Sequence, residues 1–312
     1  MIDLRRLQTL RVLAQHQTVT SAAAVLHLTP SAVSWQLRQL SAELGVALVS
    51  PHGRGVRLTP AAHTLIARAD ELYARWEQIE AELAATSKGV SGMLRLCGFS
   101  TAASAVLPPV VSRLGESWPN LAVRIIEAAP ADCFDLLLAD EADVAVVVAT
   151  PGLPPTTDER FEQRSLLDDP LDLVVPEGHP LATNKTVRLT DAADQPWVVA
   201  RPGSPYHQLV LSACAAAGFT PVIAHEASEW DTGAALIARG FGVGLIPRLA
   251  HLPAGYATVR VPLHGDPIPV RRILTCVRRG SAEQPAIAAA LRTLTTVADT
   301  IASQADQLTN AC

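Results

Sequence analysis

The stretch from Thr18 to Gly45 constrains the fold most, because its pattern is that of two short helices joined by a tight turn. In the first helix the apolar residues recur at helical spacing and would face a core: Val19, Ala22, Ala23 and Leu26. Thr29 is a suitable N-cap for the second helix, and Pro30 fits its first turn, where the missing N–H would be unpaired in any case. The pattern therefore predicts that a second helix begins at Pro30.

The second helix divides into an apolar stripe and a polar remainder. The stripe consists of Val33, Leu37, Leu40 and Leu44. The other faces carry mainly short or hydrogen-bonding side chains: Ser31, Ser34, Trp35, Gln36, Arg38 and Gln39. A recognition helix in a major groove needs small residues for close approach and amide or guanidinium groups to read base edges. On spacing alone, an ordinary helical hairpin with a solvated polar face is an equal alternative.

Two flanking segments extend the pattern, LRRLQTLRVLA from Leu4 and GRGVRLTPAA from Gly53. Together with the central HLTPSAVSWQLRQLSAELG they resemble the winged helix-turn-helix of the LysR-type transcriptional regulators. The sequence departs from that family's pattern at three places: Trp35 stands where a basic residue is common, Pro30 and Ser31 differ in order from the common Gln-Pro, and Val49 to Pro51 replace the usual Phe-Glu-Arg. These departures bear on individual base and phosphate contacts and leave the motif intact.

A packing helix over Leu4–His16 and a hairpin over Val46–Leu58 would complete this module. The hairpin has glycines on both sides of Arg54, so its tip can bring that guanidinium close to a phosphate backbone at the minor groove. A plain surface hairpin is the alternative. The expected DNA contacts are Thr29, Ser31, Ser34, Trp35, Gln36, Arg38, Arg54 and Arg57.

Charge is distributed unevenly along the chain. The 312 residues have a formal net charge of −5, but Met1 to Leu58 holds six arginines against two acidic residues, a local net charge of +4 that leaves −9 for the rest. This asymmetry supports a DNA-binding module joined to an acidic body, in a chain long enough for two or three units.

The sequence gives no sign of secretion or of a membrane span. Its five cysteines are far apart and odd in number, which suggests neither a disulfide framework nor a metal site. Arginine and glutamine interrupt the first twenty positions, and no apolar run approaches the roughly 18 residues of a membrane span. We therefore expect a cytoplasmic protein with reduced thiols and no membrane partner.

A longer helix should begin after the Thr59 cap and run to about Ala85. Its apolar residues are spaced alternately by four and three and so form a heptad seam: Leu65, Ala69, Leu72, Trp76, Ile79 and Leu83. So narrow a seam needs a partner helix, and we expect the same helix of a second chain; packing against the chain's own body is the alternative. A homodimer would supply a second recognition helix and hence a paired half-site.

Residues 87–92 form a short, glycine-containing hinge, after which apolar runs alternate with helical segments. The expected strands are Leu94–Phe99, Leu121–Ile126, Val144–Val148, Leu171–Val175, Trp197–Ala200, Val222–Ala224 and Val243–Ile246. The expected helices are Ala102–Leu114, Ala131–Leu138, Tyr206–Ala217 and Trp230–Ala238. Such alternation implies a parallel α/β sheet, and two such blocks in series imply two lobes with a cleft between them.

Three phrases of this body resemble the effector-sensing domain of the same family, which is similar to type 2 periplasmic solute-binding proteins: PEGHPLA from Pro176, GFGVGLIPR from Gly240 and WPNLAVRI from Trp118. The resemblance implies a multidomain chain, with an all-α winged helix-turn-helix and a linker helix before a two-lobed α/β domain. We expect a DNA-binding domain at 1–58, a dimerisation helix at 59–86, a hinge at 87–92 and an effector domain at 93–312. By the resemblance, lobe I comprises 93–160 and 265–305, including a C-terminal helix at about Pro285 to Ala302, and lobe II comprises 161–264.

A ligand of an open α/β sheet lies beyond the carboxyl ends of the strands, often at helix N-termini. Three such places in this chain carry polar or aromatic side chains, and we expect the effector there: Ser100 and Thr101, then Arg201, Gly203 and Ser204, then Trp230 and Asp231. Each set has a plainer interpretation as helix caps or surface charges. Arg201 could hold a carboxylate, and Trp230 with Asp231 could hold an amine.

The sequence contains no G-x-S-x-G, H-E-x-x-H, P-loop or dinucleotide-binding motif, so we expect no catalytic residues, cofactor or metal. The resemblance implies a transcriptional regulator that binds double-stranded DNA, forms a homodimer and then a tetramer, and responds to a small effector such as an amino acid or a carboxylate. RNA polymerase is a further candidate partner. The alternatives are an enzyme on a solute-binding fold and an architectural DNA-binding protein without a ligand.

Overall fold

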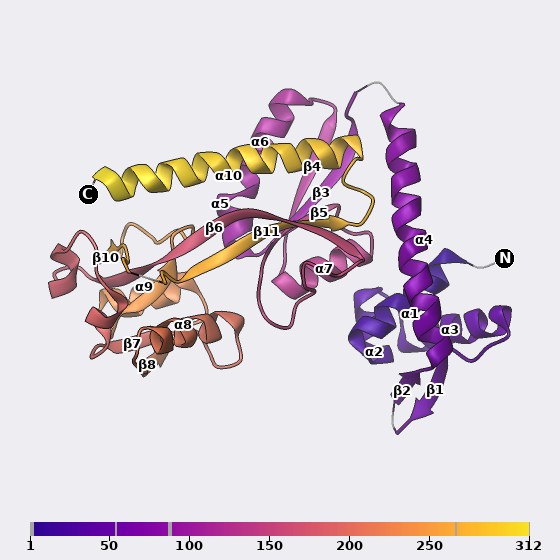
Figure 1. Ribbon diagram of the computed structural model, residues 1–312, viewed down its shortest axis with the longest axis horizontal. Coiled ribbons are helices and arrows are strands. Elements are labelled where there is room, and N and C mark those ends of the chain that lie inside the picture. The colour runs from indigo at the N-terminus through magenta and orange to yellow at the C-terminus, as the bar shows by residue number, and fades with distance from the viewer. Residues whose placement is uncertain (1–2, 54, 87–88, 266, 312) are drawn as a thin grey trace.

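The computed structural model describes residues 3–53, 55–86, 89–265 and 267–311, with side chains as far as Gln304. A helical N-terminal module and a longer α/β body lie side by side and are joined through the long helix α4 (Figure 1). Within the described residues, no helix combines the length and the apolar character that crossing a membrane requires.

The N-terminal module consists of three helices, a hairpin and the start of α4. Its elements are α1 Leu4–His16, α2 Val19–Val25, α3 Pro30–Leu44, β1 Val49–His52, β2 Gly55–Leu58 and α4 Pro60–Ala85. The predicted caps of α3 and α4 are confirmed, because the side chains of Thr29 and Thr59 each accept a hydrogen bond from a backbone N–H of the helix that follows, and Thr18 caps α2 in the same way. Fully buried side chains from α1, α3 and the start of the hairpin form the module's core: Leu10, Leu13, Val33, Leu37, Leu40 and Leu48.

The α/β body is built on one large sheet with the strand order β10-β6-β11-β5-β3-β4 and with β9 also paired to β6. The strands of lobe I are β3 Gly92–Gly98, β4 Leu121–Glu127 and β5 Val144–Val148, and its helices are α5 Ser100–Ala105, α6 Leu107–Ser117 and α7 Pro130–Leu138. β3 pairs in parallel with both β4 and β5, as the alternating pattern predicts. The structure divides the single helix expected over Ala102–Leu114, because a new helix begins at Leu107 with Pro108 in its first turn.

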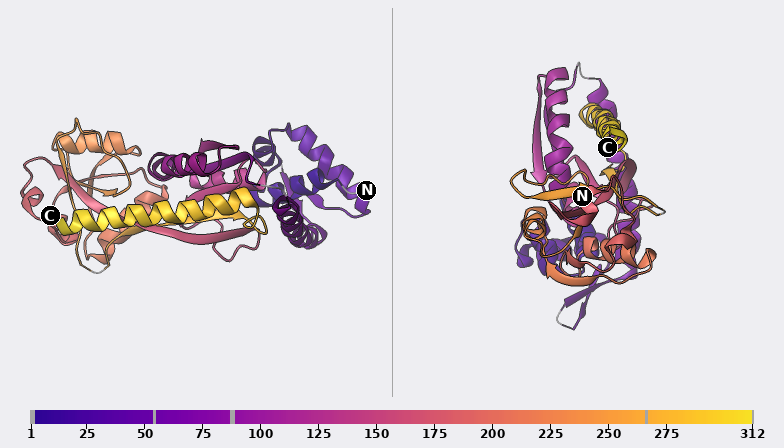
Figure 2. Two further views of the ribbon diagram at one scale, coloured as in Figure 1. Left: turned by 90° about the horizontal axis from the view of Figure 1, so that it is seen from above. Right: turned by 90° about the vertical axis from the view of Figure 1, so that its left-hand side faces the viewer.

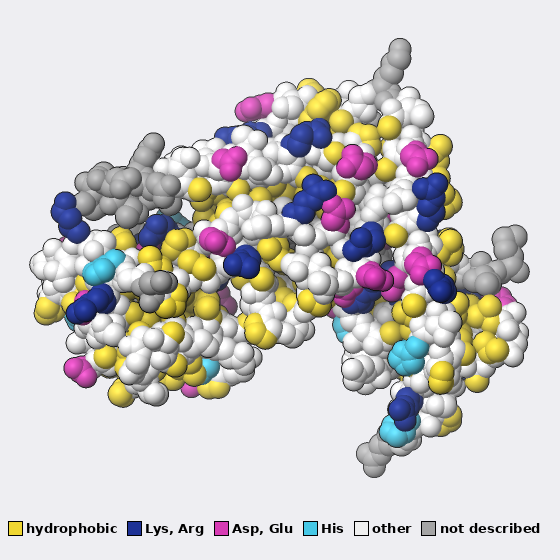
Figure 3. Space-filling model, in the orientation of Figure 1, with side chains coloured by type: hydrophobic (Ala, Val, Ile, Leu, Met, Phe, Trp, Pro, Cys, Tyr) yellow, Lys and Arg dark blue, Asp and Glu magenta, His cyan; other side chains and the backbone are white. Residues whose placement is uncertain are grey.

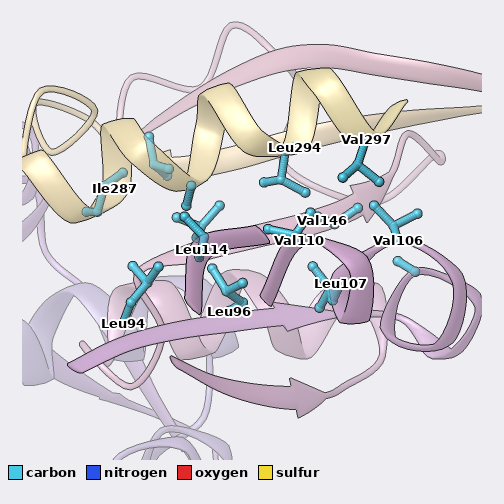
Figure 4. Close-up of a cluster of buried hydrophobic side chains, with 14 of the residues drawn as sticks. Leu94, Leu96, Val106, Leu107, Val110, Leu114, Val146, Ile287, Leu294 and Val297 are labelled. Carbon is cyan, nitrogen blue, oxygen red and sulfur yellow. The ribbon is translucent and has the colours of Figure 1, made fainter. Parts of the chain in front are cut away.

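The last helix, α10 Pro285–Ala311, covers the sheet of lobe I and continues toward lobe II, so it is longer than predicted (Figure 1; Figure 2, left). Its residues Leu294 and Val297 point at Val110 of α6, above Leu96 of β3 (Figure 4). Leu294, Val110 and Leu96 are completely buried. The C-terminal helix α10 therefore completes the hydrophobic core of lobe I, to which β3 also contributes.

Two long strands, β6 Phe161–Pro176 and β11 Val270–Arg278, connect the lobes and pair antiparallel with each other. In lobe II, β6 also pairs with β9 Gly244–Pro247 and β10 Thr258–Val261. The sheet as a whole is therefore mixed, which corrects the expectation of a parallel sheet. The predicted strand Leu171–Val175 is the lobe II end of the much longer β6.

Lobe II is completed by β7 Pro196–Val199 and β8 Val222–Glu226, which form a parallel pair, and by α8 Pro205–Ala216 and α9 Trp230–Ala238. The indole of Trp197 is completely buried in its core. Gly242 lies so close to the backbone of Pro196 that a Cβ there would be 2.6 Å from the Pro196 carbonyl oxygen. Its φ of +155° also favours glycine at this position.

The N-terminal module and α4 contact lobe I at several points, among them His27 with Glu141 and the Gln8 amide with the Leu138 carbonyl. On α4, the buried Glu77 accepts hydrogen bonds from Arg278 and from Gln284, the latter at 2.9 Å. Beside them, a Cβ at Gly280 would lie 2.2 Å from the carbonyl oxygen of Ala74, so the turn after β11 fits against the backbone of α4 only as glycine.

Another contact joins the end of α1 to α7. The Gln15 amide donates to Asp135 at 2.6 Å, and His16 Nε2 lies 2.9 Å from the same carboxylate oxygen. Arg160 in turn donates to the Gln15 side-chain oxygen at 2.7 Å. Burial raises the pKa of Asp135, although His16 opposes this shift. The Asp135 carboxylate of lobe I is thus held by Gln15 and His16 of α1, and Arg160 of lobe I binds the same Gln15 side chain.

Candidate DNA-binding and effector-binding sites

The helix α3 presents most of its predicted DNA contacts to solvent. Thr29 caps the helix by accepting from the Ala32 N–H at 3.2 Å, and the Ser31 hydroxyl lies 3.0 Å from the Thr29 hydroxyl. Thr29, Ser31, Trp35 and Arg38 are exposed, and Ser34 is half-buried. The apolar face of the same helix is anchored in the core, so the outer face is held in a fixed orientation.

Gln36 differs from the sequence-based expectation. Its side-chain oxygen accepts a hydrogen bond from the Thr9 hydroxyl of α1, and it lines a cavity of about 500 Å³ between the module, α4 and lobe I. The residue therefore faces α1 in this structure and does not join the exposed face of α3. Helical spacing alone could not reveal this, because the direction of α1 across α3 decides it.

The arginines of the module separate into internal and outward groups. Arg6 pairs with Glu43 and lies over the Trp35 ring, 5.5 Å from its centroid, while Arg11 pairs with Asp70 at 2.5 Å. Arg5, Arg38 and Arg57 are exposed and form no ion pair with any residue that the structure describes. Cations of this second kind are available for phosphates.

The hairpin pairs β1 with β2 in the expected way, with Ser50 opposite Arg57. Arg57 is exposed on the returning strand. Arg54, the other predicted contact of the hairpin, lies outside the described residues.

The predicted seam on α4 divides into two parts. Leu65 packs against the core of the N-terminal module and Ala69 is 2% exposed, so these two residues are covered by their own chain. Farther along, Leu72 and Trp76 are about half exposed and Leu83 is 63% exposed, while Ile79 is half-buried. Hydrophobic side chains follow this outer edge of α4 (Figure 3). Only the second part of the seam is free to receive a partner helix.

Thr101, in the first turn of α5 just after β3, is one of the predicted effector residues that the structure brings together with residues from elsewhere. It is 3% exposed, and its hydroxyl accepts a hydrogen bond from Arg271 Nη2 at 3.0 Å. Arg271, on β11, also donates to the buried Asp169 of β6, from Nη2 at 2.6 Å and from Nε at 3.1 Å. The Arg271–Asp169 ion pair, which lies on the two strands that connect the lobes, thus holds the Thr101 hydroxyl of lobe I.

Trp230 approaches the same arginine from lobe II. The Arg271 guanidinium carbon lies 5.8 Å from the Trp230 ring centroid and 5.3 Å from that of Phe99 in lobe I. The Trp230 ring meets Tyr206 edge to face, with 4.7 Å between their centroids, and the Tyr206 hydroxyl donates to the Leu245 carbonyl at 2.7 Å. Burial raises the pKa of Tyr206, so it stays a neutral donor. Each lobe therefore contributes one aromatic ring to the surroundings of Arg271.

The remaining predicted effector residues do not contact Arg271. Ser100 and Asp231 are exposed at helix starts, and Arg201 and Gly203 are exposed in the loop before α8. Ser204 is the N-cap of α8 and accepts from the His207 N–H at 3.0 Å. For Ser204 the plainer interpretation as a cap describes the observed contact.

Sequence reasoning missed three residues of this region, Phe99, Asp169 and Arg271. The signal for Arg271 was present, since it stands two positions before the buried Ile273, on the same face of a strand. Nothing local marked Asp169 as its partner, because the two are 102 positions apart. Among the described residues, no three His, Cys, Asp or Glu side chains are grouped in a way that could hold a metal ion.

Comparison with known proteins agrees with both parts of the chain. Residues 87–299 match the family described as the LysR substrate binding domain, and residues 4–63 match the bacterial regulatory helix-turn-helix proteins of the lysR family. The transcriptional regulator BsdA of Bacillus subtilis is 30% identical over 250 residues, which cover 79% of this chain and 84% of BsdA. The regulator CysB of Haemophilus influenzae is 28% identical over 241 residues, covering 77% of this chain and 73% of CysB.

Solved structures share the whole fold. A variant of full-length OxyR from Pseudomonas aeruginosa superposes with a TM-score of 0.64 at 22% identity, covering 96% of this chain and 95% of OxyR. Full-length BenM gives a TM-score of 0.58 at 23% identity, covering 96% and 98%. Since the first family match alone spans more than half of the 312 residues, the chain belongs to the LysR family of transcriptional regulators.

Proposed function

We propose that this regulator binds a partly palindromic operator as a homodimer, with one α3 helix of each chain in successive major grooves. Two such dimers would form the working tetramer in the cytoplasm. The observation that carries the DNA-binding part is the outer face of α3, where Thr29, Ser31, Trp35 and Arg38 are exposed on a helix whose other face is anchored in a core. Arg5 and Arg57 are exposed cations of the same module and form no ion pair in the described structure.

For the effector, we propose a small molecule that binds between the lobes near Thr101 and Trp230. Those two side chains come from opposite lobes and both contact Arg271 on a connecting strand. A ligand that contacts both lobes prefers one angle between them, and this preference would shift the tetramer between two arrangements of its recognition helices. Contact with RNA polymerase would follow from the arrangement that activates.

The test is anisotropy binding of the purified chain to the intergenic DNA beside its own gene, repeated with a panel of amino acids and small carboxylic acids. Arg38→Ala should weaken operator binding by about 1–3 kcal/mol and reduce the preference over random DNA, whereas Arg57→Ala should weaken both equally and lower the salt slope by about one. Arg292→Ala removes the same charge from the exposed face of α10 and serves as the control. Equal affinity for operator and random DNA in the unaltered protein would contradict the proposal.

A further inference from the structure

The outer face of α3 carries an exposed tryptophan. Trp35 is 50% exposed, and among residues 30–44, all of which the structure describes, it is the single large hydrophobic side chain that is exposed. An isolated exposed hydrophobic residue is ordinary on a protein surface. This one, however, lies on the helix that the family match assigns to a DNA-binding module, so its partner in the complex is DNA.

Trp35 lies on the side of α3 that turns away from the module core. Ser31, Trp35 and Arg38 are four and three residues apart, so their side chains form one row along the helix. Leu44, nine positions after Trp35 and therefore on the opposite side, packs against the core. A recognition helix in a major groove would turn the row of Trp35 toward the base edges.

The indole is held in place by a cation from α1. The guanidinium carbon of Arg6 lies 5.5 Å from the Trp35 ring centroid. Arg6 is itself fixed, because it pairs with Glu43 near the end of α3 and lies 4.0 Å from the Asp3 carboxylate. One side of the ring is therefore covered by a bound cation, and the exposed part of the ring projects from a fixed base.

The chemistry of an indole limits what it can recognise in a major groove. The ring has no charge with which to neutralise a phosphate, and its one polar atom, Nε1, is a donor. A single donor distinguishes bases poorly, because guanine and adenine both offer the N7 acceptor. The C5-methyl group of thymine is apolar and occurs on that base alone, so it is the group that an apolar ring can recognise.

We propose that Trp35 reads thymine, by packing its ring against the C5-methyl group of one thymine in each half of the operator. The inference rests on the proposed placement of α3 in the major groove and names what one residue of that face recognises. Beside it, Ser31 and Arg38 supply hydrogen bonds to base edges and phosphates. Trp35 thereby determines specificity, since adenine, guanine and cytosine carry no methyl group at this edge.

A scan of thymine to uracil tests the inference, because uracil pairs as thymine does and lacks only the methyl group. Anisotropy binding would use the full chain and operator duplexes from the intergenic DNA beside its own gene, with one thymine at a time replaced by deoxyuridine. We expect one position in each half-site at which uracil weakens binding about fourfold, the effect of losing one buried methyl group. Replacing both symmetry-related positions should weaken binding about fifteenfold.

Three variants separate the ring from its N–H group and from general damage to the module. Trp35→Ala should bind the thymine and uracil duplexes equally at that position. Trp35→Phe keeps an apolar ring without the N–H, so it should keep at least half of the fourfold difference. The control is Val46→Ala, which shortens an exposed side chain just beyond the C-cap Gly45 of α3 and should leave the fourfold difference unchanged.

Three outcomes would overturn the inference while operator preference remains. They are the absence of any thymine that is sensitive to uracil, a uracil effect that persists in Trp35→Ala, and a Trp35→Phe variant as insensitive as Trp35→Ala. Equal affinity of the unaltered protein for operator and random DNA would instead overturn the proposed function, so the two failures can be told apart.

Discussion

The ion pair between Glu77 and Arg278 attaches α4 to lobe I, and removing its two partners should have unequal effects. Glu77 is 8% exposed, and besides Arg278 its only donor in the described structure is Gln284, at 2.9 Å. Arg278 has further acceptors in two backbone carbonyls at 2.7 and 3.2 Å and in the Asp140 carboxylate at 3.2 Å. Loss of Arg278 therefore leaves a buried charge nearly alone, whereas loss of the Glu77 charge leaves the cation with partners.

The magnitudes follow from this difference. Arg278→Met, which keeps the apolar stem of the side chain, should lower the free energy of unfolding by about 3–5 kcal/mol, the usual cost of breaking a buried pair from one side. Glu77→Gln should cost only about 1 kcal/mol, since a neutral amide still bonds to its neighbours. The double variant should lie nearer to Glu77→Gln than to Arg278→Met, because it contains no isolated buried charge.

The pH dependence gives the prediction a sign. Burial raises the pKa of Glu77 above its usual 4.5, against the opposing effect of Arg278. The folded chain therefore holds this proton at a pH where the unfolded chain has lost it, so the contribution of Glu77 to stability falls as pH rises through that window. Without Arg278 the pKa should rise further, so the cost of Arg278→Met should be smaller at pH 5 than at pH 8.

The assay is urea unfolding of the full chain followed by circular dichroism at pH 5 and pH 8, for the unaltered protein, both single variants and the double variant. The reasoning is refuted if Glu77→Gln costs as much as Arg278→Met at pH 8, or if the cost of Arg278→Met is the same at both pH values.

The remaining predictions concern the seam, the core, a thiol and the α1–α7 contact. Trp76→Glu, on the exposed part of α4, should shift the dimer toward monomer in sedimentation equilibrium, whereas Arg68→Glu on a neighbouring face should not; an unchanged dimer in both would show that the partner helix lies elsewhere. Leu294→Ala, at a completely buried site between α10 and the sheet, should cost about 2–5 kcal/mol in urea unfolding, and a cost below about 1 kcal/mol would mean that α10 is not part of the core. Burial raises the pKa of the Cys214 thiol to about 12, so iodoacetamide at pH 7.5 should label it in urea but not in the native chain, as peptide mass spectrometry would report. Because burial also raises the pKa of Asp135, this carboxyl makes the folded chain less stable as the pH rises from about 4 toward neutrality, and Asp135→Asn should reduce that loss of stability. An unchanged pH profile of the free energy of unfolding would exclude a role for this carboxyl.

Local patterns predicted the elements well wherever the signals were local. The bounds of α1 Leu4–His16, β5 Val144–Val148 and α9 Trp230–Ala238 coincide with the predictions. These signals act within about one turn of a helix, so they can be identified in the sequence: threonine caps, prolines in first turns and apolar periodicity.

Contacts between segments that are far apart in the sequence could not be predicted in this way. Gln36 lies off the apolar stripe of α3, and this spacing predicts an outward side chain. In the structure its side-chain oxygen instead accepts a hydrogen bond from the Thr9 hydroxyl of α1. Arg271 reaches Thr101 across 170 positions, and the pairing exists only because β11 returns beside β6 and β5. The heptad seam stays a prediction: the fold covers its first two positions and leaves Leu72, Trp76 and Leu83 exposed.

The contacts at Glu77 of α4 and at Asp135 join the DNA-binding part of the chain to lobe I at separated points, and this has a mechanical consequence. A body held at two separated points cannot swivel about either, so α3 and lobe I move as one piece within a chain. When an effector changes the angle between the lobes, the part that moves relative to the chain's own DNA-reading helix is lobe II. Under the proposed function, the effector's signal would leave the chain through the surface of lobe II and reach DNA by repositioning a neighbouring subunit, so the response would be a property of the assembly.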